Sequence, residues 1–349
     1  LTMVDMVLSN SAAGLIDLNL NQAQELIGGG CFPYVLEDYS MHGFYGSPKQ
    51  GQTLEEVKDL LLAQIADVKA GNFPDWLVDA IISDLKLNQT KKLESNSGRA
   101  NEFVDAFTLG ISWEDHQNEI AELEKVTKKD IIDFANAKYA DNYVVVYKRA
   151  GEDKSVIKVT KPSITPVSVN REDQSGFLVN LLAEEAANIE PVFLNFEKDI
   201  QKSNVGDVEL IYKENTENER FKLNYILEMG KDHDVKLKLA VDYLKYLGTD
   251  AMSPSQKEEE FYKLGCDLSV NCGSEKTTIT LSGLANNFDE SVALFEQILA
   301  GAVADDEALE NLKLSELKGR NDAKLNKQII LWRAMGSYAK YGDNSSFRN

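Results

Sequence analysis

The sequence predicts an α+β protein in which two sheet-and-helix modules are joined by an extended linker. Strand-like runs near the start are followed by several amphipathic helices, the pattern loosens over residues 151–190, and a second series of strands and helices follows. Helices that alternate with strands in this way pack against one face of a mixed or antiparallel sheet. We expect a first module over residues 1–150, a linker over 151–190 and a second module over 191–349.

The first module is expected to begin with a helix, a turn of small residues at 9–14 and a second helix from Leu15 to Ile27, which the glycines Gly28, Gly29 and Gly30 end. Thr53 and Glu56 have the spacing of a capping box, which marks the start of a helix. The remaining expectations for this module are strands at 31–39, 41–47 and 143–147 and helices at 53–71, 74–108, 112–123 and 127–139.

The second module is expected to open with strands 208–213 and 221–229, paired across a polar turn at 214–219. A helix should then end at Gly248, since glycine commonly closes helices. The other expected elements are antiparallel strands at 266–271 and 277–283 and helices at 258–264, 289–301, 305–318 and 328–341, with a short helix at 178–187 in the linker.

Composition excludes several classes of function. The net charge is −20, which argues against nucleic acid and anionic membrane surfaces, and no run of apolar residues is long enough for membrane insertion. The hydrophobic fraction of 43% is enough for a folded core. An acidic chain suits basic peptide partners, and a solvated surface explains the charge equally well. Localisation in the periplasm or in the cytoplasm is left open.

The cysteines and histidines do not form a recognisable site in the sequence. A disulfide between Cys266 and Cys272 is conceivable, although free thiols are favoured for an odd count of three cysteines. No two histidines have the spacing of metal ligands. His42 is expected to face solvent or pack on a strand, His116 to have a raised pKa or lie on the surface, and His233 to lie in a loop.

Three local patterns in the second module indicate a family. They are Leu247-Gly248-Thr249, the run from Glu260 to Gly265, and Val270-Asn271-Cys272, in an order of strands and helices that extends from 208 to 301. This stretch resembles the first half of a repeat of the insulinase-type (pitrilysin-like) zinc metallopeptidases. Residues 1–149 resemble the second half of the preceding repeat. The resemblance implies the LuxS/mitochondrial-processing-peptidase-like metallohydrolase fold.

The resemblance also implies where a zinc site would lie. In the family, a His-x-x-Glu-His helix supplies two zinc ligands and a general base, and a later Glu supplies the third ligand. Aligned on Gly248 and Thr249, the histidine positions hold Leu239 and Tyr243 and the base position holds Asp242. Glu316, 73 residues after Tyr243, is close to the third-ligand position.

Leucine does not bind zinc, so this repeat is expected to be inactive. The resemblance thus implies no catalytic and no metal-binding residue in this chain. Zinc is expected in the full-length parent if its upstream repeat is active, and the substrate-binding residues are left unassigned.

Two functions follow from the resemblance. In the first, the chain is a non-catalytic segment of a zinc metalloendopeptidase that helps enclose and bind peptide or unfolded polypeptide substrates, with the remaining halves of its own repeats as partners. In the second, the parent is a non-catalytic scaffold or binding subunit of the same architecture. The residues upstream of Leu1 would separate the two, because only an active peptidase needs a His-x-x-Glu-His motif there.

Overall fold

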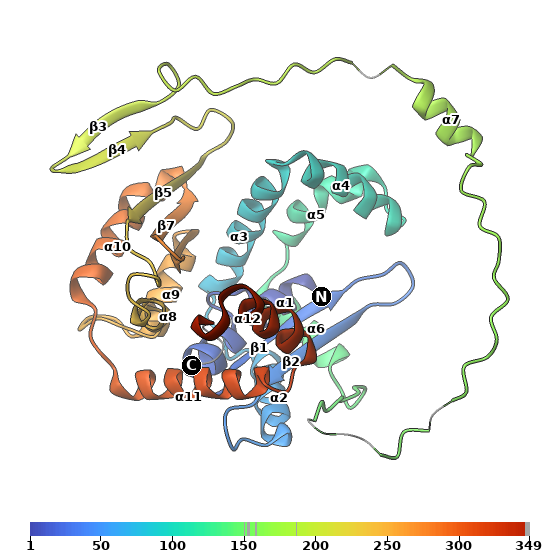
Figure 1. Ribbon diagram of the computed structural model, residues 1–349, viewed down its shortest axis with the longest axis horizontal. Helices are drawn as coiled ribbons and strands as arrows, with labels where there is room; N and C mark the ends of the chain where they lie inside the picture. The colour runs from blue at the N-terminus through green and yellow to red at the C-terminus, as the bar shows by residue number, and fades with distance from the viewer. Residues whose placement is uncertain (150, 152–153, 158, 186, 346–349) are drawn as a thin grey trace. The chain divides into compact units, whose positions relative to one another are not determined.

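The structure is a computed structural model that describes residues 1–149, 151, 154–157, 159–185 and 187–345 (Figure 1). It confirms the α+β class, since helices alternate with small antiparallel sheets. The chain divides into two units, one formed by residues 1–144 together with 217–349 and the other by residues 145–216. The domain boundaries expected at 150 and 190 stay a prediction, and residues 152–153, 158 and 186 of the expected linker lie outside the described residues.

The first stretch of the larger unit consists of a two-stranded sheet and the helices around it. Its elements are α1 (Thr2–Leu8), the π-helix η1 (Asp17–Gln22), β1 (Gly28–Tyr34), β2 (Met41–Ser47), α2 (Leu54–Ala70), α3 (Trp76–Leu93), α4 (Asn96–Thr108), α5 (Trp113–Leu123) and α6 (Lys128–Lys138). Apart from α4, these elements contribute apolar side chains to one core, in which Val7, Leu8, Ile16, Leu77 and Ile81 are fully buried. This core fixes α1 against the hairpin of β1 and β2.

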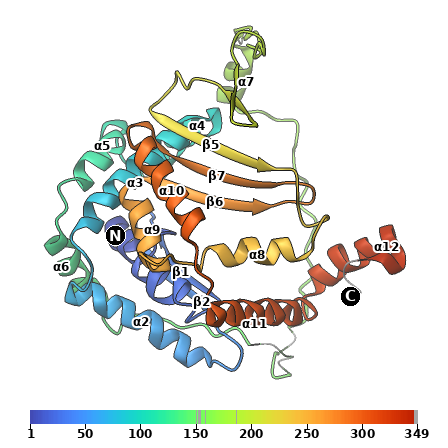
Figure 2. The ribbon, with the colours of Figure 1, turned by 90° about the vertical axis from the view of Figure 1, so that its left-hand side faces the viewer.

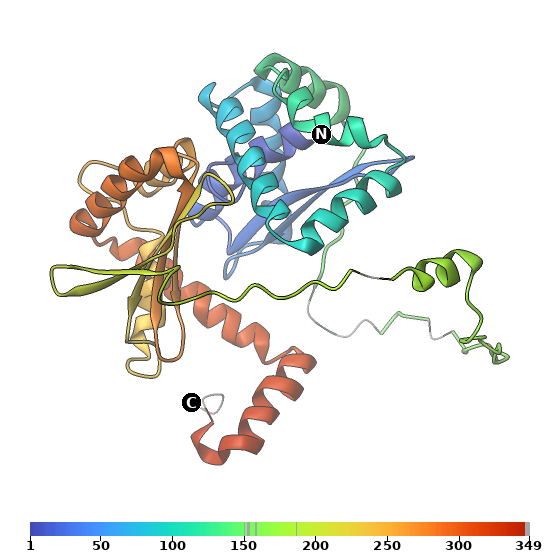
Figure 3. The same cartoon turned by 90° about the horizontal axis from the view of Figure 1, so that it is seen from above.

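The second stretch of the larger unit is built on a three-stranded sheet. Its elements are β5 (Arg220–Leu227), α8 (Lys236–Leu244), α9 (Pro254–Lys263), β6 (Cys266–Cys272), β7 (Thr277–Leu284), η2 (Ala285–Asn287), α10 (Phe288–Gly301), α11 (Asp306–Ala323), η3 (Ile329–Met335), α12 (Gly336–Tyr341) and η4 (Gly342–Asn344). The strand order is β5-β7-β6, all antiparallel, so β5 and β6 are the edges. Phe261 of α9 and Phe295 of α10 pack with Leu281 of β7, so both helices cover one face (Figures 2 and 3).

Polar contacts join the two stretches of the larger unit. The guanidinium group of Arg220 lies 2.5 Å from the Glu94 carboxylate, and the Lys91 ammonium group lies 2.8 Å from that of Asp267. Tyr262 of α9 is buried in the core of the first stretch. The two predicted half-modules therefore meet through α3 and α9 within one unit.

The smaller unit contains little regular structure. Its elements are α7 (Gly176–Ala183), β3 (Gln201–Val205) and β4 (Val208–Tyr212). The two strands form a hairpin in which Val205 pairs with Val208. Large apolar side chains are exposed in the intervening coil, including Val192 and Phe193.

Four of the expected features differ from the structure: the helix before the glycines, the helix at 74–108, the strand at 143–147 and the pairing of 208–213 with 221–229. The second helix, expected from Leu15 to Ile27, ends already at Gln22, and Gly28, Gly29 and Gly30 form the start of β1. The ring of Tyr45 lies over Gly30, where an added Cβ would be 2.8 Å from the tyrosine hydroxyl. Gly30 is thus crowded by Tyr45 of β2, whereas an added Cβ on Gly28 would have no heavy atom within 4 Å.

The helix expected at 74–108 is broken into α3 and α4. Ser95 caps the second helix by accepting the N–H of Gly98, and Gly98 lies so close to the Lys92 carbonyl that no side chain would fit.

The segment 143–147 is not a strand, since none of the described strands pairs with it. Val144 and Val146 are exposed there.

The pairing expected between 208–213 and 221–229 is also wrong. β4 pairs with β3, whereas β5 pairs with β7, from which it is separated in the sequence by two helices and β6.

Other predictions are confirmed. β2 has its expected bounds, and the capping box of Thr53 and Glu56 is present at α2. Cys266 and Cys272 are free and buried at opposite ends of β6, as favoured.

Candidate functional site

The helix α8 holds the three residues that the sequence aligned with a zinc-binding motif. The ammonium group of Lys238 pairs with both carboxylate oxygens of Asp242, one helical turn away. The hydroxyl of Tyr243 donates to the carbonyl oxygen of Asp305 at 2.5 Å and accepts the N–H of the same residue at 2.6 Å. Leu239 is half-buried. The polar groups at this position are therefore all engaged within the chain.

The end of α8 is fixed by a buried lysine. The ammonium group of Lys257 donates to the carbonyl oxygens of Leu244, Lys245 and Leu247 at 3.1–3.3 Å. Burial lowers the pKa of Lys257, and burial raises the pKa of the neighbouring Glu258. These contacts satisfy carbonyl groups that a helix end leaves without partners. The helix consequently ends at Leu244 rather than at Gly248.

Gly248 and Thr249 form a tight turn after α8. A Cβ on Gly248 would lie 2.5 Å from the Met252 carbonyl oxygen, so only glycine fits there. Thr249 donates its N–H to that same oxygen at 2.8 Å. Glu316 is exposed in α11, and no hydrogen bond or ion pair joins it to α8 among the described residues. The residues aligned with ligands are thus not gathered into a metal-binding arrangement.

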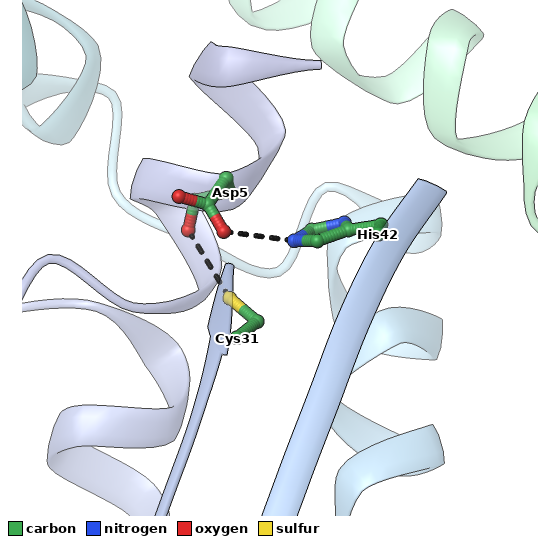
Figure 4. A group of neighbouring side chains, drawn as sticks. All are labelled: Asp5, Cys31 and His42. Atoms are coloured by element: carbon green, nitrogen blue, oxygen red, sulfur yellow. Dashed lines mark hydrogen bonds and ion pairs between the residues drawn. The ribbon is translucent and has the colours of Figure 1, made fainter. Parts of the chain in front are cut away.

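A different cluster, which the sequence did not predict, lies in the first stretch. It consists of Asp5 from α1, Cys31 from β1 and His42 from β2 (Figure 4). One ligand atom from each residue lies within 4.8 Å of the others. The carboxylate Oδ1 of Asp5 is 2.8 Å from Nε2 of His42, and the thiol of Cys31 donates to the backbone carbonyl of Asp5 at 3.6 Å.

Tyr139, directly after α6, completes the surroundings of this cluster. Its hydroxyl lies 2.5 Å from Nδ1 of His42, so both ring nitrogens have partners. Burial raises the pKa of Tyr139, and burial together with the neighbouring Asp5 raises the pKa of the Cys31 thiol. The side chain of His42 is 5% exposed and that of Asp5 is 12% exposed. The cluster is therefore largely screened from solvent.

The geometry decides which chemistry the cluster supports. A cysteine and a histidine act together as nucleophile and base when a histidine nitrogen takes the thiol proton. Here the two nitrogens of His42 face Asp5 and Tyr139, and the thiol of Cys31 donates to the backbone carbonyl of Asp5 and not to His42. Carboxylate, thiol and imidazole groups that converge in a buried place are instead the donor types that bind transition metals.

The other two histidines have local partners. Nε2 of His116 lies 2.9 Å from the carboxylate of Glu102, and its side chain is 9% exposed, so the expected surface position is wrong. His233 lies in the loop after β5, as expected, where Nδ1 accepts the N–H of Gly230.

His42 lies on β2 with a side chain that is 5% exposed, so of the two expected positions packing on a strand is observed. The sequence did not place His42 beside Asp5 and Cys31, because no local spacing links these three residues.

The strand register contains the signal that could have found the cluster. Cys31 is opposite Phe44 and Pro33 is opposite His42 in the β1–β2 hairpin. Residues two apart on a strand share a face, so Cys31 and His42 lie on the same face of the hairpin. Asp5 reaches that face only through the packing of α1 on β1, which no local pattern predicts.

No family model and no curated protein matches the sequence. Among solved structures, the chain is similar to the periplasmic protease PqqL from Escherichia coli, with 11% identity and a TM-score of 0.33. It is also similar to a variant of the ferredoxin protease FusC in complex with Arabidopsis ferredoxin, with 9% identity and a TM-score of 0.36. Each match covers 97% of this chain, but only 39% and 40% of the respective structures.

The chain thus spans about two fifths of the length of these solved structures. Within the described residues, every helix is too short or too polar to cross a lipid bilayer.

Proposed function

We propose that this chain is a non-catalytic segment of a zinc metalloendopeptidase-like protein, and that it helps enclose and bind peptide or unfolded polypeptide substrates. The observation that carries the proposal is the set of contacts made by the polar side chains of α8. Asp242 and Tyr243, which occupy the base position and one ligand position of the family motif, are engaged by Lys238 and by the backbone of Asp305. A helix with these contacts packs and positions its neighbours but has no side chain left to hold a metal.

The edge strand β6 supports the peptide-binding part of the proposal. β6 pairs with β7 on one side only, and none of the described strands pairs with its other side. An unpaired strand edge presents backbone N–H and C=O groups that bind an extended peptide as an additional strand. The helix α8 contacts β6 (Figure 2). A peptide paired with β6 would therefore lie beside α8, where an active repeat would hold its metal.

A peptide that binds through the strand edge is recognised mainly by its backbone, so peptides of many different sequences should bind. The main-chain hydrogen bonds of an added strand are the same for every residue except proline. Asp267, Ser269 and Asn271 are the exposed side chains of β6. The polar character of this strand suits a segment that binds unfolded polypeptides of varied composition.

Fluorescence anisotropy with a labelled, extended peptide tests this function. We expect saturable binding and an intact peptide in the mass spectrum after prolonged incubation with zinc. The matched control is the same peptide with alternate backbone nitrogens methylated, which removes the donors needed to pair with β6. No binding, equal binding of the methylated peptide, or cleavage by the purified chain would each overturn the proposal.

A further inference from the structure

We propose that Asp5, Cys31 and His42 form a binding site for a divalent transition metal of the zinc type, separate from the α8 position. The inference goes beyond peptide binding and departs from the expectation that this chain has no metal ligand. The site would connect the helix α1 to both strands of the β1–β2 hairpin.

The spacing of the donor atoms is close to what zinc needs. Zinc binds carboxylate oxygen, imidazole nitrogen and thiolate sulfur at about 2.0–2.3 Å, so tetrahedral ligands lie about 3.3–3.8 Å apart. In the chain, the Asp5 oxygen and the His42 nitrogen are 2.8 Å apart, and the most distant donor pair is within 4.8 Å. Small rotamer adjustments would bring all three donors to one ion, while a fourth position would remain for water.

The donor types also agree with zinc. A thiolate and an imidazole favour zinc and similar metals over calcium or magnesium, which prefer oxygen ligands alone. Asp5 adds a negative charge that would help neutralise a divalent cation. Among the described residues, the only ion pair that Asp5 makes is with His42, so no lysine or arginine occupies the place of the metal.

Tyr139 provides the outer contact that a metal-bound histidine requires. A histidine that binds a metal through one nitrogen usually donates its other N–H to a neighbouring acceptor. Nδ1 of His42 lies 2.5 Å from the hydroxyl of Tyr139. A hydroxyl both donates and accepts, so it can satisfy Nδ1 in either tautomer. Nε2 can thus donate to Asp5 in the metal-free chain and bind the metal in the loaded chain.

Titration of the metal-free chain with cobalt(II) tests the proposal, since cobalt reports its ligands optically. We expect one cobalt ion per chain, a thiolate-to-cobalt charge-transfer band, and visible bands of tetrahedral intensity. Zinc should displace the cobalt and abolish these bands. The absence of a charge-transfer band at cobalt saturation would overturn the proposal.

Variants assign the site. Cys31→Ser should remove the charge-transfer band and His42→Asn should abolish tight binding, whereas the controls Cys272→Ser and His233→Asn should bind as the unmodified chain does. Tyr139→Phe, which changes a positioning residue, should weaken binding by about tenfold to a hundredfold. Equal loss in the control variants would overturn the assignment.

A direct measurement keeps the test valid if the Cys31 or His42 variant does not fold. X-ray absorption of the zinc-loaded, unmodified chain should show one sulfur and at least one imidazole in the first coordination shell. A shell that contains only oxygen and nitrogen would contradict the proposed site.

Discussion

The hydroxyl of Tyr243 binds both backbone groups of Asp305, accepting its N–H at 2.6 Å and donating to its carbonyl at 2.5 Å. Asp305 is the N-cap of α11, so a single side chain of α8 fixes the position at which α11 starts. The residue aligned with a zinc-binding histidine therefore serves a structural contact between two helices. This contact explains why a large polar side chain is compatible with packing at this position.

Tyr243→Phe should lower the free energy of unfolding by about 1 kcal/mol, because the substitution removes the hydroxyl and leaves both groups of Asp305 without it. Urea unfolding followed by circular dichroism measures the change. Tyr246→Phe is the matched control, since its hydroxyl makes no hydrogen bond among those of the described residues. Equal destabilisation by both substitutions would show that the hydrogen bonds to Asp305 do not add to the stability of the chain.

Lys257→Met should destabilise the chain by about 1–3 kcal/mol, because three carbonyl oxygens at the end of α8 lose their donor in a buried place. Lys263→Met removes a lysine of the same helix that pairs with Glu260 near the surface, where ion pairs contribute little. We expect the second variant to unfold within error of the unmodified chain. If the two lysines are equivalent in urea unfolding, Lys257 is not what ends α8.

Glu94→Gln should reduce stability at neutral pH more than at acidic pH. Hydrogen bonds from Asn218 and Arg220 hold the pKa of Glu94 below its ordinary value of 4.5. The folded chain therefore binds this proton less readily than the unfolded chain. The stabilising contribution is present above pH 4.5 and is lost as the pH falls through the folded-state pKa.

Urea unfolding of both chains over a series of pH values measures this effect of Glu94. The two stability curves should converge on the acidic side. A difference between the chains that is constant from neutral to acidic pH would contradict the role of the Glu94–Arg220 contact.

Gly30→Ala should destabilise the β1–β2 hairpin by about 1 kcal/mol, because the new methyl group would overlap the ring of Tyr45 and displace this half-exposed side chain. Gly28→Ala is the matched control, since an added Cβ there has no heavy atom within 4 Å. Thermal unfolding of both variants shows whether only one of the three glycines is crowded, as in the observed strand, or whether all three tolerate a side chain equally. Similar melting temperatures for the two variants would contradict the observed register.

Local signals in the sequence predicted much of the fold. The capping box of Thr53 and Glu56 and the serine or threonine caps of α5 and α6 depend on residues within one turn, and these helices begin where expected. The bounds of β2 were predicted from its composition alone. These features are governed by interactions between near neighbours in the chain, which a sequence shows directly.

Contacts between distant residues account for what the sequence could not predict. β5 pairs with β7 and not with β4, because α9 and α10 bury the sheet that β5 and β7 share. The break between α3 and α4 depends on the fit of Gly98 against the Lys92 carbonyl. The Asp5–Cys31–His42 cluster likewise requires the register of the hairpin and the packing of α1 on it.

That α8 serves packing and not metal binding is tested most directly by zinc titration of the double variant Cys31→Ser/His42→Asn, which lacks the proposed separate site. Isothermal calorimetry should detect no tight zinc binding, and an extended peptide should remain intact in the presence of zinc. One tight equivalent of zinc that is lost on a further Asp242→Asn or Glu316→Gln substitution would contradict this account of α8.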